Sequence, residues 1–383
     1  MRSLIGLLGT VLTFAPTVAM ADYGLNMHKG VTKISHEIYD LHMLVLWIVT
    51  IVGILVFGVM IYSIINHRKS KGVTPATFHE STTVEVIWTV IPFVILVAIA
   101  VPATKTLLQM SDMSHPDLNI KVTGWQWKWE YDYLDNGVHF FSNLAKSSLD
   151  AGAEQVGDAK DVDNPAIHYL RNVDHPLVVP VHKKVRLLIT GADVIHSWWV
   201  PDLGVKHDAI PGHINESWFR ADKVGIYRGQ CAELCGKGHG FMPIVVKVVS
   251  ESDYKSWVAQ QKKAEAAASA DVNKTFTKAE LMAKGKKVYD TICAACHQVN
   301  GKGLPGVFPA LAGSKTVKGP KEEHIHTVVD GRPGTAMQAF GKQLNPVDIA
   351  SVITYERNSF GNNDGDIVQP SDVVAFEKNQ KSK

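Results

Sequence analysis

The sequence has almost no excess of charge and very little cysteine. Its 39 Lys and Arg residues stand against 37 Asp and Glu, which gives a formal net charge of +2. This balance provides no global positive field, so we expect no nucleic-acid partner. The four cysteines lie in two pairs, 231/235 and 293/296, with none left over. The sequence also has no internal repeat, and its 383 residues predict two or three domains.

The N-terminus has the composition of a secretory signal peptide. Arg2 supplies a short positive segment, residues 4–19 are mostly apolar, and Ala19-Met20-Ala21 is a small-x-small cleavage site. The alternative is a third transmembrane helix, but the stretch is short and Pro16 interrupts it. We therefore expect residues 1–21 to be a signal peptide that is cleaved.

Two longer apolar runs predict a transmembrane hairpin within residues 22–112. The first, 41–65, carries no charge, and as a helix it spans about 37 Å, enough for a tilted crossing. The second, about 86–108, contains two prolines, which membrane helices tolerate. The loop 67–71 is basic and belongs on the cytoplasmic side. This topology predicts a two-pass protein of a bacterial inner membrane, with lipid around its helices and with both termini and the soluble domains outside.

Residues 113–255 have the pattern of an all-β domain. Apolar or aromatic residues alternate along four segments, as they do in half-buried strands: Ile120-Lys121-Val122; Trp125, Trp127 and Trp129; Val185, Leu187 and Ile189; Ile244, Val246 and Val248. Asp135-Asn136-Gly137 is a hairpin-turn signal. Several short strands with turns between them predict a sandwich or a barrel. The polar stretch 142–172 is expected to be a surface insertion.

The composition changes after the β domain. The stretch QQKKAEAAASADVNK lacks large apolar residues, and we expect a linker over 256–277 that is helical in part. Thr277 to Glu280 has the pattern of a capping box, and Asn345-Pro346 is a second helix start. These signals predict a small all-α domain over 278–366, followed by a polar tail, 367–383.

The second cysteine pair belongs to an attachment motif for c-type haem. In Cys293-Ala294-Ala295-Cys296-His297, the thiols would form thioethers with the haem vinyl groups and the histidine would bind the iron. The alternative in an oxidising compartment is a local disulfide, which has no need of the histidine. Met337, in a flexible loop before the last helix, is the expected sixth ligand, and its thioether suits electron transfer. Two histidines, His324 and His326, are the competing candidates.

The first cysteine pair lies in the stretch CAELCGKGHGFM. Four of its residues are potential metal ligands: Cys231, Cys235, His239 and Met242. A disulfide would use only the cysteines, and zinc would gain little from a thioether. Thiolate, thioether and imidazole together favour copper, and a second histidine is available at His196. Two bridging thiolates, two histidines, one thioether and one backbone carbonyl would hold two copper ions.

The segments DVIHSWWVPDLGVKHDAIPG and YRGQCAELCGKGHGFMPIVV resemble the dinuclear copper motif of cytochrome c oxidase subunit II. The resemblance covers residues 40–255 and implies a two-helix hairpin ahead of a cupredoxin domain. The attached α domain is similar to the class I cytochrome c domain of caa-type oxidases. The resemblance also implies the role of each copper ligand. His196 and His239 would bind one copper each, and Cys231 and Cys235 would bridge both ions. Met242 and the carbonyl of Glu233 would be weak ligands.

Further roles are implied by the same resemblance. The carboxylate of Glu233 would face a magnesium ion shared with subunit I. Trp127 would be the entry point for electrons, although aromatic alternation on a strand is also ordinary packing. Glu85 would mark the cytoplasmic mouth of a proton pathway, although a carboxylate at a helix N-terminus is favourable in itself. One departure is His213, where arginine is expected in many relatives.

The predicted function is that of the electron-entry subunit of a proton-pumping terminal oxidase. Electrons would come from cytochrome c or a cytochrome bc complex to the tethered haem c, pass to the two coppers, and leave for haem a in subunit I. Subunit I, which also holds the active-site copper, would reduce oxygen to water, and subunit III would be a further partner. The alternatives are the electron-entry subunit of a copper-containing nitric oxide reductase and a free-standing membrane-anchored electron carrier.

Overall fold

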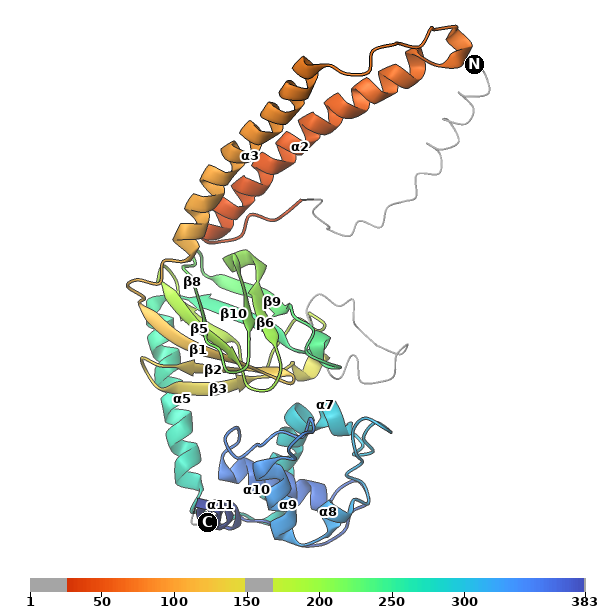
Figure 1. The fold of residues 1–383 in the computed structure, drawn as a ribbon. Coiled ribbons are helices and arrows are strands. Elements are labelled where there is room, and N and C mark those ends of the chain that lie inside the picture. Colours follow the sequence, from red (N-terminus) through yellow and green to blue (C-terminus); the bar gives the residue numbers. More distant parts are fainter. Residues whose placement is uncertain (1–25, 149–167, 382–383) are drawn as a thin grey trace, which may run out of the picture. The chain divides into compact units, whose positions relative to one another are not determined.

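The computed structural model describes residues 26–148 and 168–381. The expected signal peptide lies outside this range, as does most of the expected surface insertion. The chain divides into two compact units, one formed by residues 1–29 with 38–99 and the other by residues 30–37 with 100–383. The first unit contains most of the two apolar helices, and the second contains their remaining turns, the β domain and the α domain (Figure 1).

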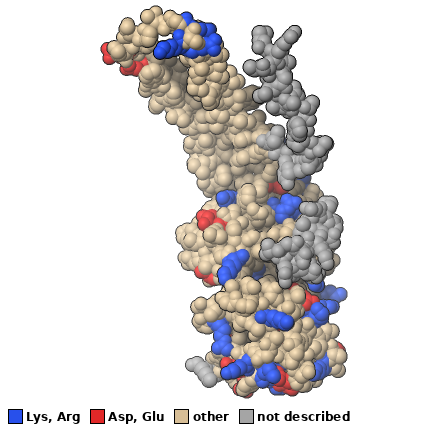
Figure 2. Space-filling model, turned by 90° about the vertical axis from the view of Figure 1, so that its right-hand side faces the viewer, with Lys and Arg blue, Asp and Glu red and all other residues tan. Residues whose placement is uncertain are grey.

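Two long helices confirm the predicted hairpin. They are α2 (Lys33–Asn66) and α3 (Thr82–Met110), and the loop between them contains the short 3-10 helix η1 (Lys69–Lys71). Both are long and apolar enough to cross a membrane, and each extends beyond the apolar run that predicted it. On the face shown in Figure 2, the surface between the helix ends carries no charged side chain, whereas Lys and Arg gather at the loop.

Reciprocal hydrogen bonds define the start of α2. The amide of Thr32 donates to Ser35 Oγ (3.0 Å), and the amide of Ser35 donates to Thr32 Oγ1 (2.9 Å), a variant of the capping box with serine as the third helical residue. Thr32 Oγ1 also donates to the carbonyl of Leu203 in the β domain (3.0 Å). The helix therefore begins at Lys33, several residues before the apolar run.

The β domain is a sandwich of two five-stranded sheets, ordered β3-β2-β1-β5-β8 and β4-β10-β9-β6-β7. Most neighbouring strands are antiparallel, but β1 pairs with β5 and β10 with β4 in parallel. The strands are β1 (Leu118–Trp125), β2 (Lys128–Tyr133), β3 (Val138–Ser142), β4 (Leu177–Pro180), β5 (Val185–Gly191), β6 (His196–Val200), β7 (Val205–Ala209), β8 (Asn215–Phe219), β9 (Gly225–Cys231) and β10 (Pro243–Val249). The 3-10 helices η2 (Pro201–Leu203) and η3 (His239–Phe241) lie in its loops.

The predicted alternation places one face of each sheet in a common core. Val185, Leu187 and Ile189 on β5 are fully buried, and the alternating residues of β10 are buried with them. Burying such a side chain stabilises the fold by about 1.5–3 kcal/mol. The core also contains Tyr133, whose hydroxyl accepts from the amide of Val178 (2.9 Å) and donates to its carbonyl (2.8 Å). The packed core of the sandwich therefore supports the loops at its edge.

A helix, α5 (Glu251–Asp271), occupies most of the expected linker. Ser250 caps it by accepting from the amide of Asp253 (3.1 Å). Tyr254 and Trp257 in its first turns pack against the core of the sandwich. The later turns are rich in Ala, Lys, Glu and Gln, which have high helix propensity. The connection between the soluble domains is therefore helical as far as Asp271.

The second soluble domain is all-α, as predicted. Its elements are α6 (Lys278–Val288), the π-helical turn η4 (Tyr289–Cys293), α7 (Ala294–His297), α8 (Lys315–Lys318), α9 (Lys321–Asp330), α10 (Pro346–Arg357) and α11 (Pro370–Lys381). Thr277 and Asn345 cap α6 and α10 as expected. A Cβ on Gly285 of α6 would lie 2.0 Å from the carbonyl oxygen of Ser351 on α10, so glycine permits their close crossing. Helix α11 lies in the expected polar tail, yet its Val373 is fully buried.

Candidate functional site

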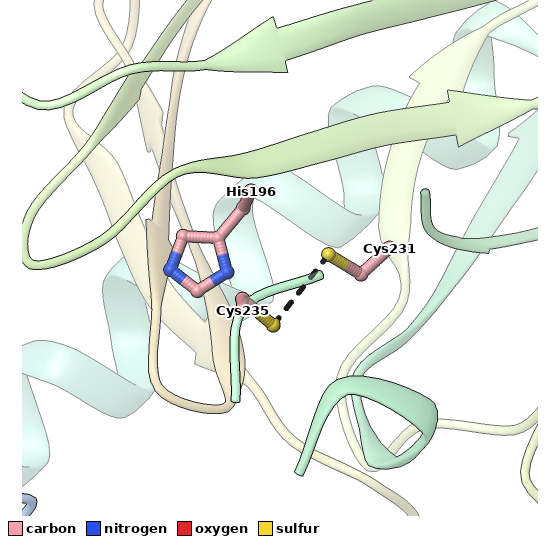
Figure 3. Close-up of side chains that lie close together, drawn as sticks. All are labelled: His196, Cys231 and Cys235. Carbon is pink, nitrogen blue, oxygen red and sulfur yellow. Dashed lines mark hydrogen bonds between the residues drawn. The ribbon is translucent and has the colours of Figure 1, made fainter. Parts of the chain in front are cut away.

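Strand ends and one loop bring the first cysteine pair and a histidine together at the edge of the β domain. His196 begins β6, Cys231 ends β9, and Cys235 lies in the loop before η3. Their ligand atoms all lie within 4.8 Å of one another, and all three residues are buried (Figure 3). Two thiols and an imidazole are a donor set that suits zinc or copper.

The sulfur of Cys235 is the centre of this cluster. It lies 3.9 Å from Cys231 Sγ, 3.6 Å from His239 Nδ1 and 3.5 Å from Met242 Sδ. Met242 is 1% exposed, so its thioether is directed into the cluster rather than into solvent. Because a thioether is a poor ligand for zinc and a good one for copper, the donor set fits copper better.

Glu233 faces the cluster with its backbone. Its carbonyl oxygen lies 3.3 Å from Cys231 Sγ, whereas the residue as a whole is exposed. The carbonyl and the carboxylate are therefore available to different partners. The roles predicted for Glu233 need both groups: the carbonyl would bind copper, and the carboxylate would bind magnesium.

The ring of His196 is held with one nitrogen directed into the cluster. Nε2 lies 2.9 Å from Asp193 Oδ1, and Nδ1 is buried without a hydrogen-bond partner among the described residues. A buried imidazole nitrogen is costly to leave unpaired, and metal-binding histidines commonly bond a carboxylate through the other nitrogen. A Cβ on Gly124 would lie 2.7 Å from His196 Cδ2, so glycine leaves room for the ring. This geometry favours metal binding through Nδ1.

The two thiols of the cluster differ in electrostatics. The hydrogen bond from Cys235 lowers the pKa of Cys231, assisted by His196 and opposed by burial. The same interaction, together with burial, raises the pKa of Cys235. Cys231 therefore loses its proton more readily than Cys235, and metal binding that displaced the protons of both would leave two thiolates as ligands.

Trp127 contacts the cysteine loop from the opposite sheet. It lies with Gln126 in the turn between β1 and β2, so the expected strand alternation through Trp127 is wrong. Its indole Nε1 donates to the carbonyl of Cys235 (3.1 Å). A Cβ on Gly238 would lie 2.2 Å from Trp127 Cδ2, so the indole lies directly on the loop. Because Trp127 lies in a turn, the direction of its side chain is set by its contacts with the cysteine loop and not by the two-residue alternation of a strand.

The second cysteine pair lies where η4 meets α7, and all four cysteines of the chain are free thiols. His297 Nδ1 lies 2.9 Å from the carbonyl oxygen of Pro309, so this nitrogen carries the proton and donates. The lone pair of Nε2 is then available to a metal, as in most iron-binding histidines. Cys293, Cys296 and His297 therefore fit covalent haem.

The candidates for the sixth ligand differ in their surroundings. Met337 packs against the α-domain core that also includes Cys293, and its carbonyl accepts from the amide of Arg332 (2.8 Å). His324 is buried and hydrogen-bonded to another side chain, and the side chain of His326 is 49% exposed. Met337 therefore remains the predicted ligand.

Two other residues singled out in the sequence lie away from these clusters. Glu85 is exposed in the first turn of α3, where the helix dipole favours a carboxylate. His213 is exposed in the turn after β7, and its amide donates to the carbonyl of Ile210. Their predicted roles concern partner subunits and remain predictions.

One supporting residue was not identified from the sequence. Asp193 accepts from the amide of Gln126 (2.7 Å) through one carboxylate oxygen and bonds His196 through the other. Burial alone raises the pKa of Asp193, but the hydrogen bonds from His196 and the backbone lower it overall. Its position three residues before His196 in DVIHSW was the available signal.

Three family models match consecutive parts of the chain. They are cytochrome c oxidase subunit II, transmembrane domain (residues 20–106), cytochrome c oxidase subunit II, periplasmic domain (118–249), and cytochrome c oxidase, cbb3-type, subunit III (280–355). The matches follow the order of the hairpin, the β domain and the α domain. They confirm the predicted fold class and the fusion to a cytochrome c domain.

Named relatives carry the same assignment. A probable cytochrome c oxidase subunit 2 of Rickettsia bellii is 38% identical over 265 residues, covering 69% of this chain and 94% of the relative. A cytochrome c oxidase subunit 2 of Cereibacter sphaeroides is 37% identical, and the match covers 62% of this chain and 80% of the relative. The chain is also similar to the periplasmic domain of subunit II of cytochrome oxidase of Bradyrhizobium japonicum, whose crystal structure is known. The two sequences are 45% identical, the match covers 40% of this chain and 98% of the other, and the TM-score is 0.34. The chain belongs to the cytochrome c oxidase subunit II family, a membrane-anchored electron-transfer component of an oxidoreductase complex, and carries a cytochrome c domain on its C-terminal side.

Proposed function

We propose that this chain is the electron-entry subunit of a proton-pumping terminal oxidase. It accepts electrons at a haem c on its α domain, transfers them to a dinuclear copper centre in its β domain, and delivers them to haem a in subunit I, where oxygen is reduced to water. The observation that supports this best is the meeting of all six predicted copper ligands in one cluster.

The residues of the β domain fit two copper ions. His196 offers an Nδ1 that is buried and has no hydrogen-bond partner among the described residues. The lowered pKa of Cys231 favours the thiolate that metal binding requires. Two copper ions held by these residues would supply one-electron transfer. The protein holds the ligands in place: Asp193 orients His196, and the Trp127 indole donates to the Cys235 carbonyl.

The residues of the α domain fit one covalently bound haem c. Cys293 and Cys296 would form the thioethers, and His297, through Nε2, and Met337 would bind the iron. Haem with histidine and methionine ligands supplies one-electron transfer at a raised potential. The Pro309 carbonyl holds the tautomer of His297 that binding requires. The covalent connection through α5 raises the effective concentration of the electron donor at the copper site.

The remaining residue roles concern partners. The exposed carboxylate of Glu233 binds a magnesium ion shared with subunit I, and Glu85 lies at the cytoplasmic entrance of a proton pathway. Trp127 is the electron-entry residue. The basic loop at η1 supports a two-pass orientation in a bacterial inner membrane with the soluble domains outside. Subunit III and membrane lipid complete the complex, and cytochrome c or a cytochrome bc complex supplies electrons.

Purification of the complex from its native membrane tests this proposal. We expect two coppers and one haem c per chain, haem a in the partner subunit, and oxygen consumption that depends on cytochrome c. One zinc and no copper would contradict the copper assignment. Haem b with nitric oxide consumption would identify a nitric oxide reductase, and isolation without haem-bearing partners would identify a free electron carrier.

A further inference from the structure

A turn of the β domain contacts the α domain, which belongs to the same compact unit. The turn joins β1 to β2, and the carbonyl of its Gln126 accepts a hydrogen bond from Gln338 Nε2. Lys128, the first residue of β2, donates through Nζ to Gln343 Oε1. Both glutamines lie in the segment between α9 and α10. The two domains are therefore joined by polar contacts as well as by helix α5.

The α-domain side of this contact lies beside both residues expected to bind the haem iron. Gln338 directly follows Met337, the predicted sixth ligand. Phe308 lies one residue before the carbonyl group that accepts from His297 Nδ1. Its ring meets that of Trp127 edge to face, with the centroids 6.4 Å apart. The contact therefore brings two segments next to the haem ligands to the residue predicted to admit electrons.

The β-domain side of the contact is bonded to the copper cluster. Gln126 Nε2 donates to the carbonyl of Cys235 (2.9 Å). The amide of Gln126 donates to Asp193 (2.7 Å), which bonds His196. Because its carbonyl accepts from Gln338, Gln126 is hydrogen-bonded to the α domain and to the copper site at once.

Lys128 is a buried cation whose direct partners come largely from the α domain. It is 6% exposed, and no carboxylate in the described part of the chain forms an ion pair with it. Its Nζ lies 4.8 Å from the ring centroid of Phe340 in the α domain and 4.9 Å from that of Phe141 on β3. Aromatic faces attract a cation, and Gln343 Oε1 accepts a hydrogen bond from it. Because lysine is almost never buried without partners, the α domain is what allows this burial.

The acidic groups that act on Lys128 are bonded to other residues. Glu130 accepts from Trp125 (2.9 Å) and lies 2.8 Å from His139 Nε2, and Asp193 is bonded within the copper site. Burial lowers the pKa of Lys128 to about 8, opposed by the two cysteines of the haem motif and by these two carboxylates. Lys128 therefore stays mostly charged at neutral pH.

The two glutamines orient each other for this contact. Gln343 Nε2 donates to the carbonyl of Ala339 (2.8 Å) and to Gln338 Oε1 (3.3 Å), which leaves Gln343 Oε1 to accept from Lys128. Gln338 Oε1 is then occupied, and its Nε2 donates to the Gln126 carbonyl. The α domain therefore presents a preorganised acceptor for a cation.

We propose that Lys128 is a positioning residue for electron transfer, which holds the segments beside the haem ligands against Trp127 by bonding Gln343. The inference rests on the proposed function and adds that the haem c of the same chain is the immediate donor to the copper site. One electron passes from the reduced haem to the oxidised copper centre, and no bond forms or breaks. Because electron tunnelling falls steeply with distance, loss of the contact slows this step without removing either centre.

The test is single-turnover kinetics in the full oxidase, with one electron injected photochemically into haem c and its transfer to copper followed by absorbance. Gln343→Lys places a second cation against Lys128, and Lys128→Glu removes the cation from the two aromatic rings. Each change should slow the transfer about tenfold or more. The double variant restores a pair of opposite charges and should be faster than either single variant, a coupling that a merely structural role would not produce.

The matched control is Lys247→Glu, the same change at an exposed lysine of β10, which should transfer electrons at the native rate. Native rates in both single variants, or a double variant slowed by the product of the two single effects, overturn the proposal. If Lys128→Glu does not assemble, Lys128→Met should lessen the effect of Gln343→Lys because the repulsion is gone, and an undiminished effect also overturns the proposal. Copper and haem spectra of the native complex separate these outcomes from failure of the proposed function, which the absence of either centre would contradict.

Discussion

The two cysteine pairs of this chain have similar spacing but opposite electrostatics. In the β domain the thiols contact each other, and their hydrogen bond lowers the pKa of Cys231 while raising that of Cys235. In the α domain burial raises the pKa of both Cys293 and Cys296. One thiol of the first pair therefore loses its proton readily. Both members of the second pair stay protonated, which is the form that adds across a vinyl group. The surroundings rather than the spacing distinguish the two chemistries.

The largest expected effect is the loss of one metal centre without the other. Cys231→Ser replaces a soft thiolate with a hydroxyl, so we expect the copper to be lost. The fall in oxidase activity should exceed the 10–100-fold typical of outer-sphere changes. Copper analysis and the haem c spectrum of the purified complex measure the two sites separately. A variant that retains both coppers would show that the two cysteine pairs are not functionally distinct.

Substitution of a cysteine in the α domain tests the second cysteine pair. Cys293→Ala should leave haem attached through Cys296 alone, because one thiol remains to form a thioether. The pyridine haemochrome band should therefore shift toward that of a singly attached haem, while the copper content stays equal to that of the native complex. Cys296→Ala is the matched variant and should give the same shift. Loss of copper in either variant would contradict the independence of the two sites.

A smaller effect on copper binding is expected from substitution of Asp193, which is hydrogen-bonded to His196. Asp193→Asn keeps the size of the side chain but removes the charge that orients the ring, so copper affinity should fall by about 10–100-fold. Asp222→Asn, at an exposed position outside the cluster, is the control and should bind copper normally. Competition with a copper chelator measures both. Equal affinity in the two variants would show that Asp193 does not position the ligand.

The sequence predicted which residues would meet around Cys235 because four of them lie within one short stretch of the chain. The combination of thiols, thioether and imidazole favours copper as the metal they would bind. It did not identify Asp193, because a single carboxylate near a histidine is common and only the fold shows that it bonds Nε2. The strand pattern misplaced Trp127, because its position in the turn between β1 and β2 depends on contacts with the loop of Cys235. The apolar runs found both membrane helices but missed the extra turns of α2, since these depend on the Thr32 and Ser35 cap.

Removal of one hydrogen bond at the copper loop should have a modest effect on stability. Trp127→Phe keeps an aromatic ring against Gly238 but removes the donor to the Cys235 carbonyl, a net loss of about 1 kcal/mol. Electron transfer into the copper site should slow while copper content is unchanged. Trp218→Phe, whose indole bonds the carbonyl of Gln109 instead, is the matched control. Flash-induced single-turnover kinetics compare the two, and equal rates would exclude an electron-entry role for Trp127.

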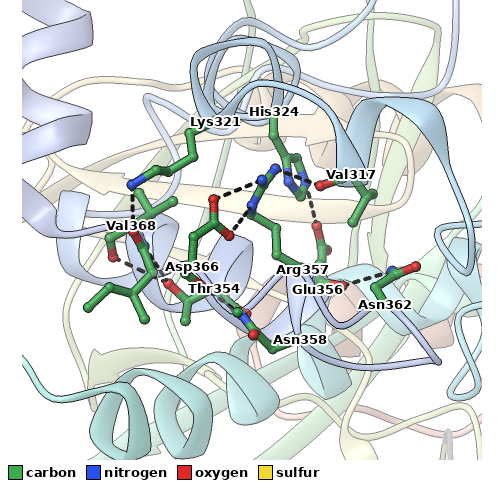
Figure 4. A network of polar contacts seen from close by, with 12 residues as sticks. Val317, Lys321, His324, Thr354, Glu356, Arg357, Asn358, Asn362, Asp366 and Val368 are labelled. Carbon is green, nitrogen blue, oxygen red and sulfur yellow. Dashed lines mark hydrogen bonds and ion pairs between the residues drawn. The ribbon is translucent and has the colours of Figure 1, made fainter.

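The smallest effect concerns the ion pair between Arg357 and Asp366 within the α domain (Figure 4). Burial raises the pKa of Asp366, but the hydrogen bonds and charge of Arg357 more than offset this and lower it overall. A lowered folded-state pKa means that the stabilisation is complete above the unfolded-state value, about 3.9, and is lost as pH falls through the folded-state value. Because Asp366 is partly exposed, Asp366→Asn should cost only about 1 kcal/mol near neutral pH. Thermal unfolding followed by the haem c signal should show this difference from pH 7 down to about pH 4 and lose it progressively at lower pH. A difference that persists in strong acid would assign the stabilisation to hydrogen bonding rather than charge.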